Sequence, residues 1–269
     1  MSGLEFLDVR VRFGRGAKTV HAVHGVSLEV PAGQVVGLVG ESGSGKSTLG
    51  RTAVGLAPLD GGSILIDGQP IRSRFRRGEP RPVQMVYQDP YSSLDPRMTV
   101  GDSIAEALPV AARRRASSRR AEVSRLLDLV SLEADYQEML PGRLSGGQLQ
   151  RIALARALGA RPRYVVADEV TSALDVSVQG AVLNLVREVQ RDLGFGMLFI
   201  SHNLAVVRYL SDAIAVMRLG KIVEAGPTDE LIANPRSRYT RALLAAAPHR
   251  RERDGLQGYN RHVAQSDEI

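Results

Sequence analysis

The chain has 269 residues, of which 43% are hydrophobic, 4% are aromatic and none is cysteine, and its formal net charge is +6. This is enough for one large domain, or for one domain with an embedded subdomain, while the lack of cysteine excludes disulfides, thiolate metal sites and iron–sulfur clusters. Because no apolar run reaches the roughly 18 residues of a membrane span, and no basic and apolar leader is visible, we expect a soluble, cytoplasmic protein.

The first predicted elements lead into a glycine-rich loop. Residues 4–13 alternate apolar and polar side chains, which predicts a half-buried strand, and residues 26–30 predict another. Residues 34–39 form a short apolar run that feeds directly into the loop at 40–47. Apolar residues at helical spacing follow from Lys46 onward. This order of strand, loop and helix is the context in which such a loop binds phosphate.

The rest of the chain alternates predicted strands with helices. Strands are predicted over residues 83–88, 164–167 and 196–200. A helix is predicted over 176–193, and residues from about 91 to 160 have a mainly helical pattern. Such alternation implies a mostly parallel sheet, so the helical block is interpreted as an insertion into an α/β core. The polar segment 250–269 is expected to be loosely ordered.

The loop itself has the composition of a phosphate-binding loop. It consists of Gly40, Glu41, Ser42, Gly43, Ser44, Gly45, Lys46 and Ser47, followed by Thr48. Its glycines let backbone N–H groups approach phosphates closely, and the helix N-terminus adds a partial charge of about half a unit. Lys46 is placed to reach the β- and γ-phosphates, and Ser47 to ligate Mg²⁺. Because Gly45-Lys46-Ser47 follows a predicted strand, a phosphate-binding loop is favoured over a glycine turn without a ligand.

Polar side chains that follow the predicted strands suit the chemistry of ATP hydrolysis. Asp168 and Glu169 end an apolar strand, where open α/β sheets usually bind ligands. Asp168 suits a direct or indirect partner of Mg²⁺, and Glu169 suits the base that orients and deprotonates a water. His202, just past the next strand, is placed to contact the γ-phosphate, and Gln88, at the end of another strand, to contact metal and water. The alternatives are an acidic helix cap and a structural histidine.

A second loop of small residues, Leu144-Ser145-Gly146-Gly147-Gln148, precedes another helical pattern. It would form a second anion site. One nucleotide per chain does not need two such sites. The economical explanation is that each loop serves a different nucleotide, so that two copies of the domain would have to meet face to face.

Basic residues are concentrated in two clusters. These are Arg72, Arg74, Arg76, Arg77 and Arg81, and Arg113, Arg114, Arg115, Arg119 and Arg120. Such runs fit a solvated loop and helix face, or contact with acidic lipid headgroups. Nucleic acid is not expected as a partner, because no aromatic side chains are interleaved to stack on bases.

The order of these motifs resembles the nucleotide-binding domain of ATP-binding cassette (ABC) transporters over about residues 4–230. The motifs are the loop 40–47, Gln88, Leu144–Gln148, Asp168-Glu169, Ser172-Ala173-Leu174-Asp175 and His202. A finer similarity is to the ATPases of oligopeptide, dipeptide and nickel importers, and it is closer to the second of the two ATPases that such importers usually carry. It rests on Gln88–Arg97, Thr171–Gln179, Gly220–Gly226, Asn234-Pro235 and Tyr239-Thr240.

The resemblance implies a fold and a reaction. The implied fold is α/β, with a P-loop NTPase core built on a mostly parallel sheet, an N-terminal antiparallel β subdomain and an inserted α-helical subdomain. The nucleotide-binding domain would span residues 4–245, and a C-terminal extension typical of peptide importers residues 225–269. The implied reaction is ATP hydrolysis with ATP and Mg²⁺ bound, with Glu169 and His202 as catalytic residues and Ser47, Gln88 and Asp168 at the metal.

The resemblance also implies partners. Ser145, Gly146, Gly147 and Gln148 would bind the γ-phosphate of the ATP held by a second ATPase subunit, identical or related, and Asp175 would lie at the dimer seam. Gln88 and the helical insertion would contact a cytoplasmic helix of two membrane permease subunits, which work with an extracytoplasmic solute-binding protein. The protein would then lie peripherally on the cytoplasmic face of the membrane.

Two departures from the family pattern stand out. Val170 follows Glu169 where the family usually has proline, which would bias Glu169 towards an extended conformation. Since valine is itself at home in extended geometry, we expect a tolerated change. The aromatic residue that stacks on adenine is assigned to Phe13, with His21 as the alternative because the inserted Gly14-Arg15-Gly16 makes the alignment ambiguous.

The leading hypothesis is therefore the ATP-hydrolysing subunit of an importer for peptides or a related solute. One alternative is a regulatory cassette that binds ATP with weak hydrolysis, which Val170 suggests. Another is a non-transport ABC ATPase acting on DNA or ribosomes. Such proteins usually carry coiled coils, zinc modules or two fused cassettes, and none of these is visible in the sequence.

Overall fold

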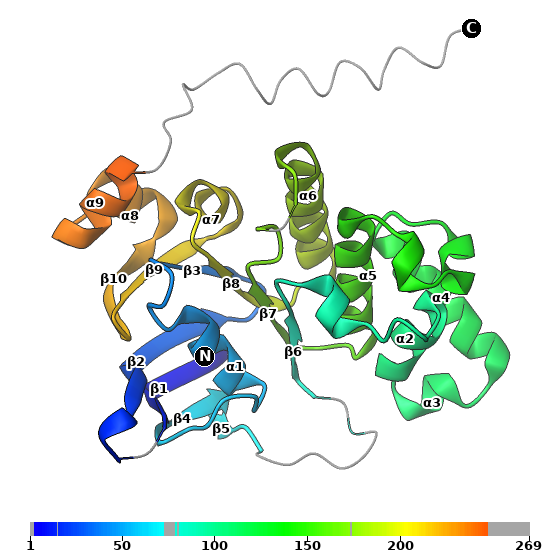
Figure 1. Cartoon of the computed structure of the whole chain (residues 1–269), viewed down its shortest axis with the longest axis horizontal. Coiled ribbons are helices and arrows are strands. Elements are labelled where there is room, and N and C mark those ends of the chain that lie inside the picture. The colour runs from blue at the N-terminus through cyan, green and yellow to red at the C-terminus, as the bar shows by residue number, and fades with distance from the viewer. Residues whose placement is uncertain (1–2, 15, 73–78, 80, 173, 247–269) are drawn as a thin grey trace, which may run out of the picture.

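The computed structural model describes residues 3–14, 16–72, 79, 81–172 and 174–246. The segment 250–269, expected to be loosely ordered, lies outside the described residues. Figure 1 shows two sheets on the left and in the middle of the molecule, and a group of helices on the right. One sheet has four strands in the order β2-β1-β4-β5, and the other has six in the order β10-β9-β3-β8-β7-β6.

The four-stranded sheet is antiparallel throughout and comes from the first part of the chain. Its strands are β1 (Gly3–Phe13), β2 (Val20–Pro31), β4 (Gly61–Ile66) and β5 (Gln69–Pro70), and a short 3₁₀ turn, η1 (Gly16–Lys18), joins β1 to β2. The alternating pattern of the first strand is confirmed, whereas β2 is much longer than the predicted 26–30. Its first half is mostly exposed, so it lacks the hydrophobic signal on which that prediction rested.

The six-stranded sheet is mostly parallel, as predicted. Its strands are β3 (Val35–Val39), β6 (Val83–Val86), β7 (Tyr164–Asp168), β8 (Gly196–Ser201), β9 (Ala213–Arg218) and β10 (Lys221–Pro227). Only β10 runs antiparallel to its neighbour. All five residues of β3 are buried, and so are all five of β7, which is typical of parallel strands covered on both faces.

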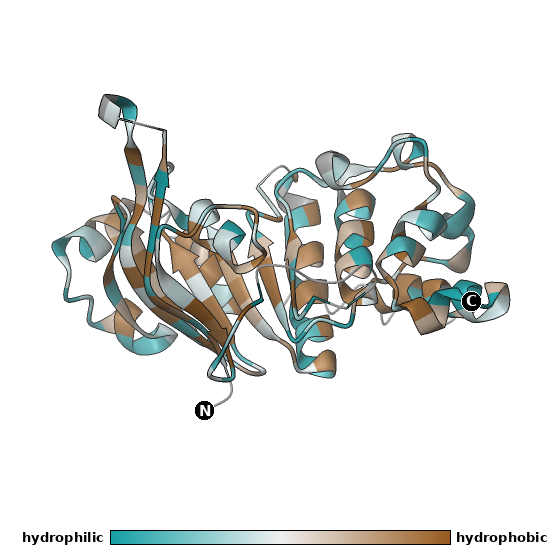
Figure 2. Ribbon diagram, turned by 90° about the horizontal axis from the view of Figure 1, so that it is seen from below, coloured by the Kyte–Doolittle hydropathy of each residue, from teal (hydrophilic) through white to brown (hydrophobic). Residues whose placement is uncertain are grey.

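The six-stranded sheet separates two hydrophobic cores. Along β3, Val35 and Val39 face the core shared with the helices, while Val36 and Leu38 face the core shared with the antiparallel sheet. This alternation is the two-residue period of a strand. Figure 2 shows the strands of both sheets as predominantly hydrophobic ribbons and the helices as mixed hydrophobic and hydrophilic ones. The parallel sheet therefore forms the rigid centre of the molecule.

Several helices pack against this sheet or against the helices beside it. α1 (Lys46–Ala53) lies between the two sheets, α6 (Val176–Leu193) contacts α5, and α7 (Leu204–Leu210) packs on β3 and β8. The predicted helix over 176–193 is confirmed at both ends; it stops at Gly194, which has a left-handed φ of 66°. At Gly37 an added Cβ would lie under 3.0 Å from Val207, so only glycine lets α7 approach β3 this closely.

The helices on the right of Figure 1 form the block expected over about 91–160. They are α2 (Val100–Ala107), α3 (Val110–Arg113), α4 (Ala116–Leu129) and α5 (Gly146–Gly159), with 3₁₀ turns η2 (Pro90–Ser93), η3 (Ala134–Glu138) and η4 (Pro141–Arg143). The last helices, α8 (Thr228–Ala233) and α9 (Arg238–Ala246), follow β10. None of the helices in the described ranges is both long and apolar enough to cross a membrane.

Candidate functional site

The loop 40–47 joins the end of β3 to the start of α1 and is closely packed from two sides. Gly45, at the N-terminus of α1, has a left-handed φ of 102°. An added Cβ on Gly45 would lie under 3.0 Å from the Ala22 carbonyl, and one on Gly40 under 3.0 Å from the Met217 carbonyl. The backbone N–H of Gly220 donates to the Ser44 carbonyl at 2.9 Å. Both β2 and the turn after β9 therefore hold this loop, and glycine is required at both positions.

Lys46 is buried and folded back onto its own loop. Its Nζ donates to the carbonyls of Gly40 and Glu41, both at 2.8 Å, and lies 3.4 Å from the Ser44 hydroxyl. Burial lowers the pKa of Lys46, and the carboxylates of Glu169 and Asp168 oppose that shift. A buried ammonium held by backbone carbonyls at the start of a helix suits an anionic ligand, which would supply the missing negative charge.

Asp168, the last residue of β7, lies against the start of α1. The Ser47 hydroxyl donates to Asp168 Oδ1 at 2.8 Å, and only 4% of Asp168 is exposed. Burial raises the pKa of this carboxyl, and the effect outweighs the hydrogen bond from Ser47 and the charges of Arg51 and Lys46. The structure thus brings together the two oxygen donors predicted for the metal.

These two oxygens fit Mg²⁺ by their chemistry. In the described part of the chain, no group of three or more histidine, aspartate or glutamate side chains is arranged to hold a metal ion. Mg²⁺ is commonly held by one or two protein oxygens and completes its shell with phosphate oxygens and water. Ser47 and Asp168 supply such a pair directly beside the phosphate loop, so the residues present fit a nucleotide-bound Mg²⁺ rather than a site made by protein alone.

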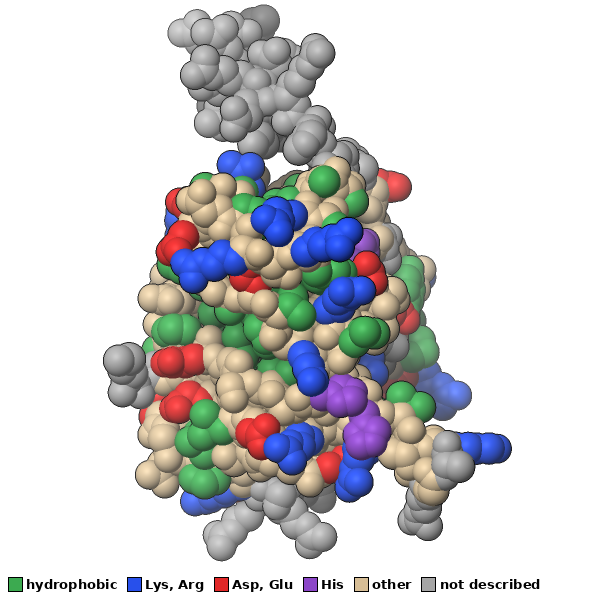
Figure 3. Space-filling model, turned by 90° about the vertical axis from the view of Figure 1, so that its left-hand side faces the viewer, with side chains coloured by type: hydrophobic (Ala, Val, Ile, Leu, Met, Phe, Trp, Pro, Cys, Tyr) green, Lys and Arg blue, Asp and Glu red, His purple; other side chains and the backbone are tan. Residues whose placement is uncertain are grey.

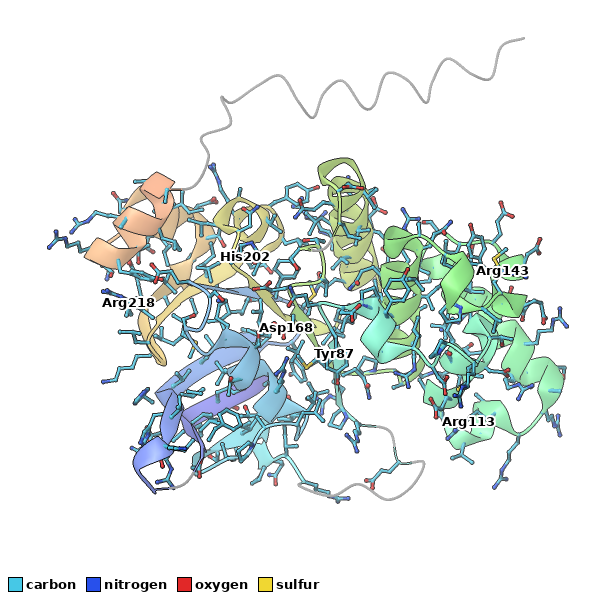
Figure 4. The ribbon with its side chains drawn as sticks, viewed as in Figure 1. Tyr87, Arg113, Arg143, Asp168, His202 and Arg218 are labelled. Carbon is cyan, nitrogen blue, oxygen red and sulfur yellow. The ribbon has the colours of Figure 1, made fainter. Side chains whose placement is uncertain are left out.

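Glu169 and His202 follow two neighbouring strands and face each other. Glu169 Oε1 lies 3.3 Å from His202 Nδ1, with 18% of the glutamate side chain exposed and 56% of the histidine side chain. The Glu169 N–H donates to the Ile200 carbonyl at 2.9 Å. Figure 4 shows Asp168 and His202 in the middle of the molecule, at the ends of β7 and β8.

The backbone of Glu169 differs from the expectation. Its φ is +50°, which is left-handed, so the extended geometry that a following proline favours does not describe this residue. That Val170 is a tolerated change stays a prediction. The following Val170 is buried in the core, and Glu169 turns the chain sharply at the strand end while the Ser172 hydroxyl donates to its carbonyl at 2.9 Å. Strained backbone of this kind is common at functional sites.

Gln88 is not at the end of its strand. The predicted strand 83–88 is wrong at its C-terminal end, because β6 stops at Val86 and Asp89-Pro90 already begins the η2 turn. Gln88 is exposed, and among the described residues its side chain makes no hydrogen bond to Ser47 or Asp168. The structure therefore does not join Gln88 to the other predicted metal residues.

The second small-residue loop forms the N-terminus of α5. The Gln148 N–H donates to the Ser145 hydroxyl at 3.3 Å, and the Ser145 N–H donates to Gln148 Oε1 at 2.9 Å. This is a capping box, which satisfies two backbone donors and leaves the other N–H groups of the first turn directed outward. Ser145 is exposed, and α5 lies well away from α1 in Figure 1. One chain does not bring its two glycine loops together.

Asp175 lies beside this second loop. It is exposed and precedes α6, where its carbonyl accepts the N–H groups of Val178 and Gln179 at 3.0 and 2.8 Å. An added Cβ on Gly147 would lie 2.6 Å from Val178 Cγ1, so the first turns of α5 and α6 touch. Asp175 and the residues Ser145 to Gln148 therefore belong to one surface.

Phe13 and His21 lie on the outer edge of the antiparallel sheet. Phe13 ends β1 and is 44% exposed, and His21 lies across from Arg12 on β2. The ring of His21 stacks on His24 with centroids 5.4 Å apart. Histidine and basic side chains gather on this face in Figure 3. His21 and His24 are among the residues that line a hollow of about 540 Å³. His21 precedes Ala22, whose carbonyl faces Gly45 of the phosphate loop. The assignment of the adenine contact to Phe13, with His21 as the alternative, stays a prediction.

The basic clusters are only partly described. Arg74, Arg76 and Arg77 lie outside the described residues, while Arg72 pairs with Glu79 at 3.2 Å. The second cluster lies on α3 and α4. Four of its arginines are exposed; Arg113 is half-buried.

Three features were not predicted from the sequence. A groove of about 680 Å³ runs between the end of β6 and the helices, lined among others by Tyr87, Val110, Arg113 and Arg156; Figure 4 labels Tyr87 and Arg113 on its two sides. The side chain of Gln148 donates to the Tyr136 hydroxyl at 2.9 Å. Tyr239 of α9 contacts the phosphate loop. The sequence pattern of Tyr239-Thr240 is one of the importer motifs, but its contact with the loop, like the other two features, depends on how separate segments meet in the fold.

Comparison with known proteins gives consistent matches. The family model described as ABC transporter matches residues 23–172. The chain is 44% identical to the oligopeptide transport ATP-binding protein OppF of Bacillus subtilis, over 91% of this chain and 82% of that protein. It is 47% identical to the glutathione import ATP-binding protein GsiA of Escherichia coli, over 87% of this chain but only 38% of that protein.

A solved structure matches as well. The dimeric structure of the ATP-binding cassette MJ0796, bound to ADP and Pi in a post-hydrolysis state, superposes with a TM-score of 0.72 at 25% identity. The match covers 84% of this chain and 98% of that one. The predicted α/β fold is confirmed by this likeness.

Proposed function

Because this chain belongs to the ABC transporter family and is an ATPase of that family, we propose that it powers an importer of peptides or of a related solute. One observation carries the proposal. The phosphate loop, Asp168 and the Glu169–His202 pair follow the carboxyl ends of the adjacent parallel strands β3, β7 and β8, the edge at which open α/β sheets bind ligands.

The loop residues and their neighbours have separate tasks in this proposal. Backbone N–H groups from Gly40 to Thr48 and the ammonium of Lys46 bind the phosphates of ATP. Ser47 and Asp168 would hold Mg²⁺, which neutralises phosphate charge when it is bound. Glu169 accepts the proton of the attacking water, and His202, 3.3 Å from its carboxylate, contacts the γ-phosphate and fixes the orientation of Glu169. Gln88 would approach this site only when nucleotide and partner are bound.

A second subunit completes the site. Ser145, Gly146, Gly147 and Gln148 present the exposed N-terminus of α5, and a helix N-terminus favours anions. We assign this surface, together with Asp175, to the γ-phosphate of ATP held by a partner ATPase, which is either a second copy or a related chain. The dimeric structure of MJ0796 gives this arrangement a precedent in a similar fold.

The groove between β6 and the helices is assigned to the membrane subunits. It offers apolar side chains such as Val110, half-buried Arg113, and Arg156, which pairs with Glu106 at 3.0 Å. A short cytoplasmic helix of a permease subunit would fit there, with Gln88 on the path to the nucleotide. In this proposal the protein lies peripherally on the cytoplasmic face of the membrane, in an assembly with two permease subunits and, indirectly, a solute-binding protein.

The domain limits follow from the same assignment. The nucleotide-binding domain spans residues 4–245 with its helical subdomain at about 91–160, and residues 225–269 form the extension seen in peptide importers. The solute class rests on the names of the relatives, one an oligopeptide transporter and one a glutathione importer. This chain spans 38% of the length of the glutathione protein.

The direct test is Glu169→Gln in the assembled complex. We expect ATP turnover to fall by at least about 100-fold, because removal of a general base typically costs that much or more. ATP-driven dimerisation of the isolated ATPase subunits, measured by light scattering, should persist in this variant. Glu188→Gln, which changes an exposed glutamate on α6, serves as the control and should keep wild-type turnover. Hydrolysis by Glu169→Gln at a near-normal rate would refute the role of Glu169, and a wild-type complex that binds ATP without hydrolysing it would favour the regulatory cassette.

A further inference from the structure

The last helix of the described chain touches the phosphate loop. The backbone N–H of Glu41 donates to the hydroxyl of Tyr239 at 3.1 Å, although the two residues are 198 positions apart. Tyr239 lies in the first turn of α9 and is half-buried. Its ring packs against the helix-side core, as do Leu243 and Leu244 of the same helix. The contact is therefore made by a packed side chain and not by a free loop.

Glu41 connects this tyrosine to the phosphate-binding lysine. While the N–H of Glu41 donates to Tyr239, the carbonyl of Glu41 accepts from Lys46 Nζ at 2.8 Å. Glu41 is exposed, so in the absence of Tyr239 water would compete for its N–H and this end of the loop would lose its fixed partner. The backbone of Glu41 thus makes both the hydrogen bond to Tyr239 and one of the hydrogen bonds that hold Lys46.

The tyrosine is itself held from two directions. The guanidinium of Arg218, at the end of β9, lies 4.9 Å from the centroid of the Tyr239 ring, within the range of a cation–π interaction. The carboxylate of Glu224 on β10 accepts the N–H groups of Arg236 and Ser237 at 2.7 and 3.0 Å, which fixes the start of α9. Figure 4 shows Arg218 on the side of the molecule formed by β9, β10 and α9.

We propose that Tyr239 is a positioning residue for ATP: its hydroxyl fixes Glu41 and, through Glu41, the conformation of Lys46 that receives the phosphates. The inference rests on the proposed function, since it takes the loop 40–48 as the ATP site. The C-terminal helix then contributes to nucleotide affinity without touching the nucleotide. A loop that is already ordered before ATP binds loses less conformational entropy on binding, so the affinity for ATP is higher.

The chain contains a matched control for this tyrosine. Tyr209 on α7 also lies under an arginine, Arg187, at 5.0 Å from the ring centroid, and its hydroxyl is also hydrogen-bonded, to Asn184. Among the described residues, its hydroxyl makes no hydrogen bond to the phosphate loop. Tyr239→Phe and Tyr209→Phe therefore remove the same hydroxyl from the same kind of environment, and only the first one removes a partner of Glu41.

The experiment measures the Kd of the full chain for ATP by equilibrium titration, and KM and kcat in the assembled complex. A hydrogen bond of this kind is worth about 0.5–1.5 kcal/mol, so Tyr239→Phe should raise Kd and KM by roughly 2- to 10-fold. We expect kcat to change by less than about twofold, because Glu169 and His202 are untouched. Tyr209→Phe should leave Kd and KM at the wild-type value. Arg218→Met removes the cation over the ring of Tyr239 and keeps the tyrosine hydroxyl, so we expect it to raise Kd and KM less than Tyr239→Phe does.

Hydrogen exchange of the nucleotide-free chain gives a second measurement. The Glu41 N–H should exchange faster in Tyr239→Phe than in the wild type and in Tyr209→Phe. Equal ATP affinity and equal exchange of Glu41 in the two phenylalanine variants would overturn the proposal, and so would a fall in kcat without a change in KM. If the wild type itself failed to bind ATP, the proposed function would be the part in error, so the two failures are distinguishable.

Discussion

A buried carboxylate beside the phosphate loop has a cost in the absence of ligand. Burial raises the pKa of Asp168, which means that the folded protein holds the proton of this group more tightly than the unfolded chain does. Above the folded-state pKa, the charged carboxylate therefore lowers the free energy of unfolding. This loss of stability decreases as the pH falls through the folded-state pKa, and it is gone below the pKa that the group has in the unfolded chain. A cation bound at the proposed metal site would remove this penalty.

The residue-scale prediction is that Asp168→Asn stabilises the nucleotide-free protein. In EDTA at about pH 8 the thermal midpoint should rise by a few degrees, since each 1 kcal/mol is worth roughly 2–4 °C at this chain length. The difference from the wild type should shrink as the pH falls through about 4 and approach zero near about pH 3, where the carboxyl is mostly protonated in both the folded and the unfolded chain. Thermal unfolding followed by circular dichroism checks this, and a variant less stable than the wild type at both pH values would contradict it.

At the scale of elements, two glycines distinguish close packing from open helix surface. Gly37 in β3 faces Val207 and Ser211 of α7, and an added Cβ would lie under 3.0 Å from both, whereas Gly180 in α6 has open space around it. We predict that Gly37→Ala destabilises the protein by about 1–3 kcal/mol, while Gly180→Ala stabilises it by about 0.5–1 kcal/mol because alanine is the better helix former. The midpoint of urea unfolding should fall for Gly37→Ala and rise for Gly180→Ala. Equal shifts of the two midpoints would contradict this packing of α7.

The elements also show how far the sequence could be interpreted. The helix over 176–193 was predictable at both ends, because its apolar period is continuous and Gly194 follows it. β4, β5, β9 and β10 were not predicted. β4 contains the apolar run Ile64–Ile66 and β9 the run Ala213–Met217, but periodicity alone does not distinguish such short runs from a buried helix segment. The end of β6 was placed two residues too late because apolar Tyr87 continues the pattern past the last paired residue.

The proximity of four candidate site residues could be predicted from the sequence. Short-range motifs identified Lys46, Ser47, Asp168 and Glu169, and the structure brings these residues together. The left-handed φ of Glu169 and the contact between Tyr239 and Glu41 have no local pattern, because they depend on how distant segments meet. Sequence motifs therefore identify the candidate site residues, whereas the contacts between distant segments require the tertiary structure.

At the scale of the whole molecule, the two glycine loops lie too far apart to serve one nucleotide. We predict that Ser145→Arg lowers ATP hydrolysis of the assembled ATPase pair by at least about tenfold, because a bulky cation would cover the anion-binding end of α5. The Kd of the same chain for ATP should change by less than about twofold, since its own phosphate loop is untouched. Ser117→Arg, on the exposed face of α4, is the control. Loss of ATP binding by the Ser145 variant alone would contradict the composite site.

The strand order of the central sheet also bears on how the protein is made. β3 carries the phosphate loop and lies between β8 and β9, and the N–H of Val35 is bonded to the carboxylate of Asp212, 177 residues later. At a synthesis rate of about 5–20 residues per second, β3 waits roughly 9–35 s on the ribosome for its neighbours. The β1–β2 hairpin and β4 can pair much earlier. The ATP-binding strand is thus among the first segments made and among the last to be completed.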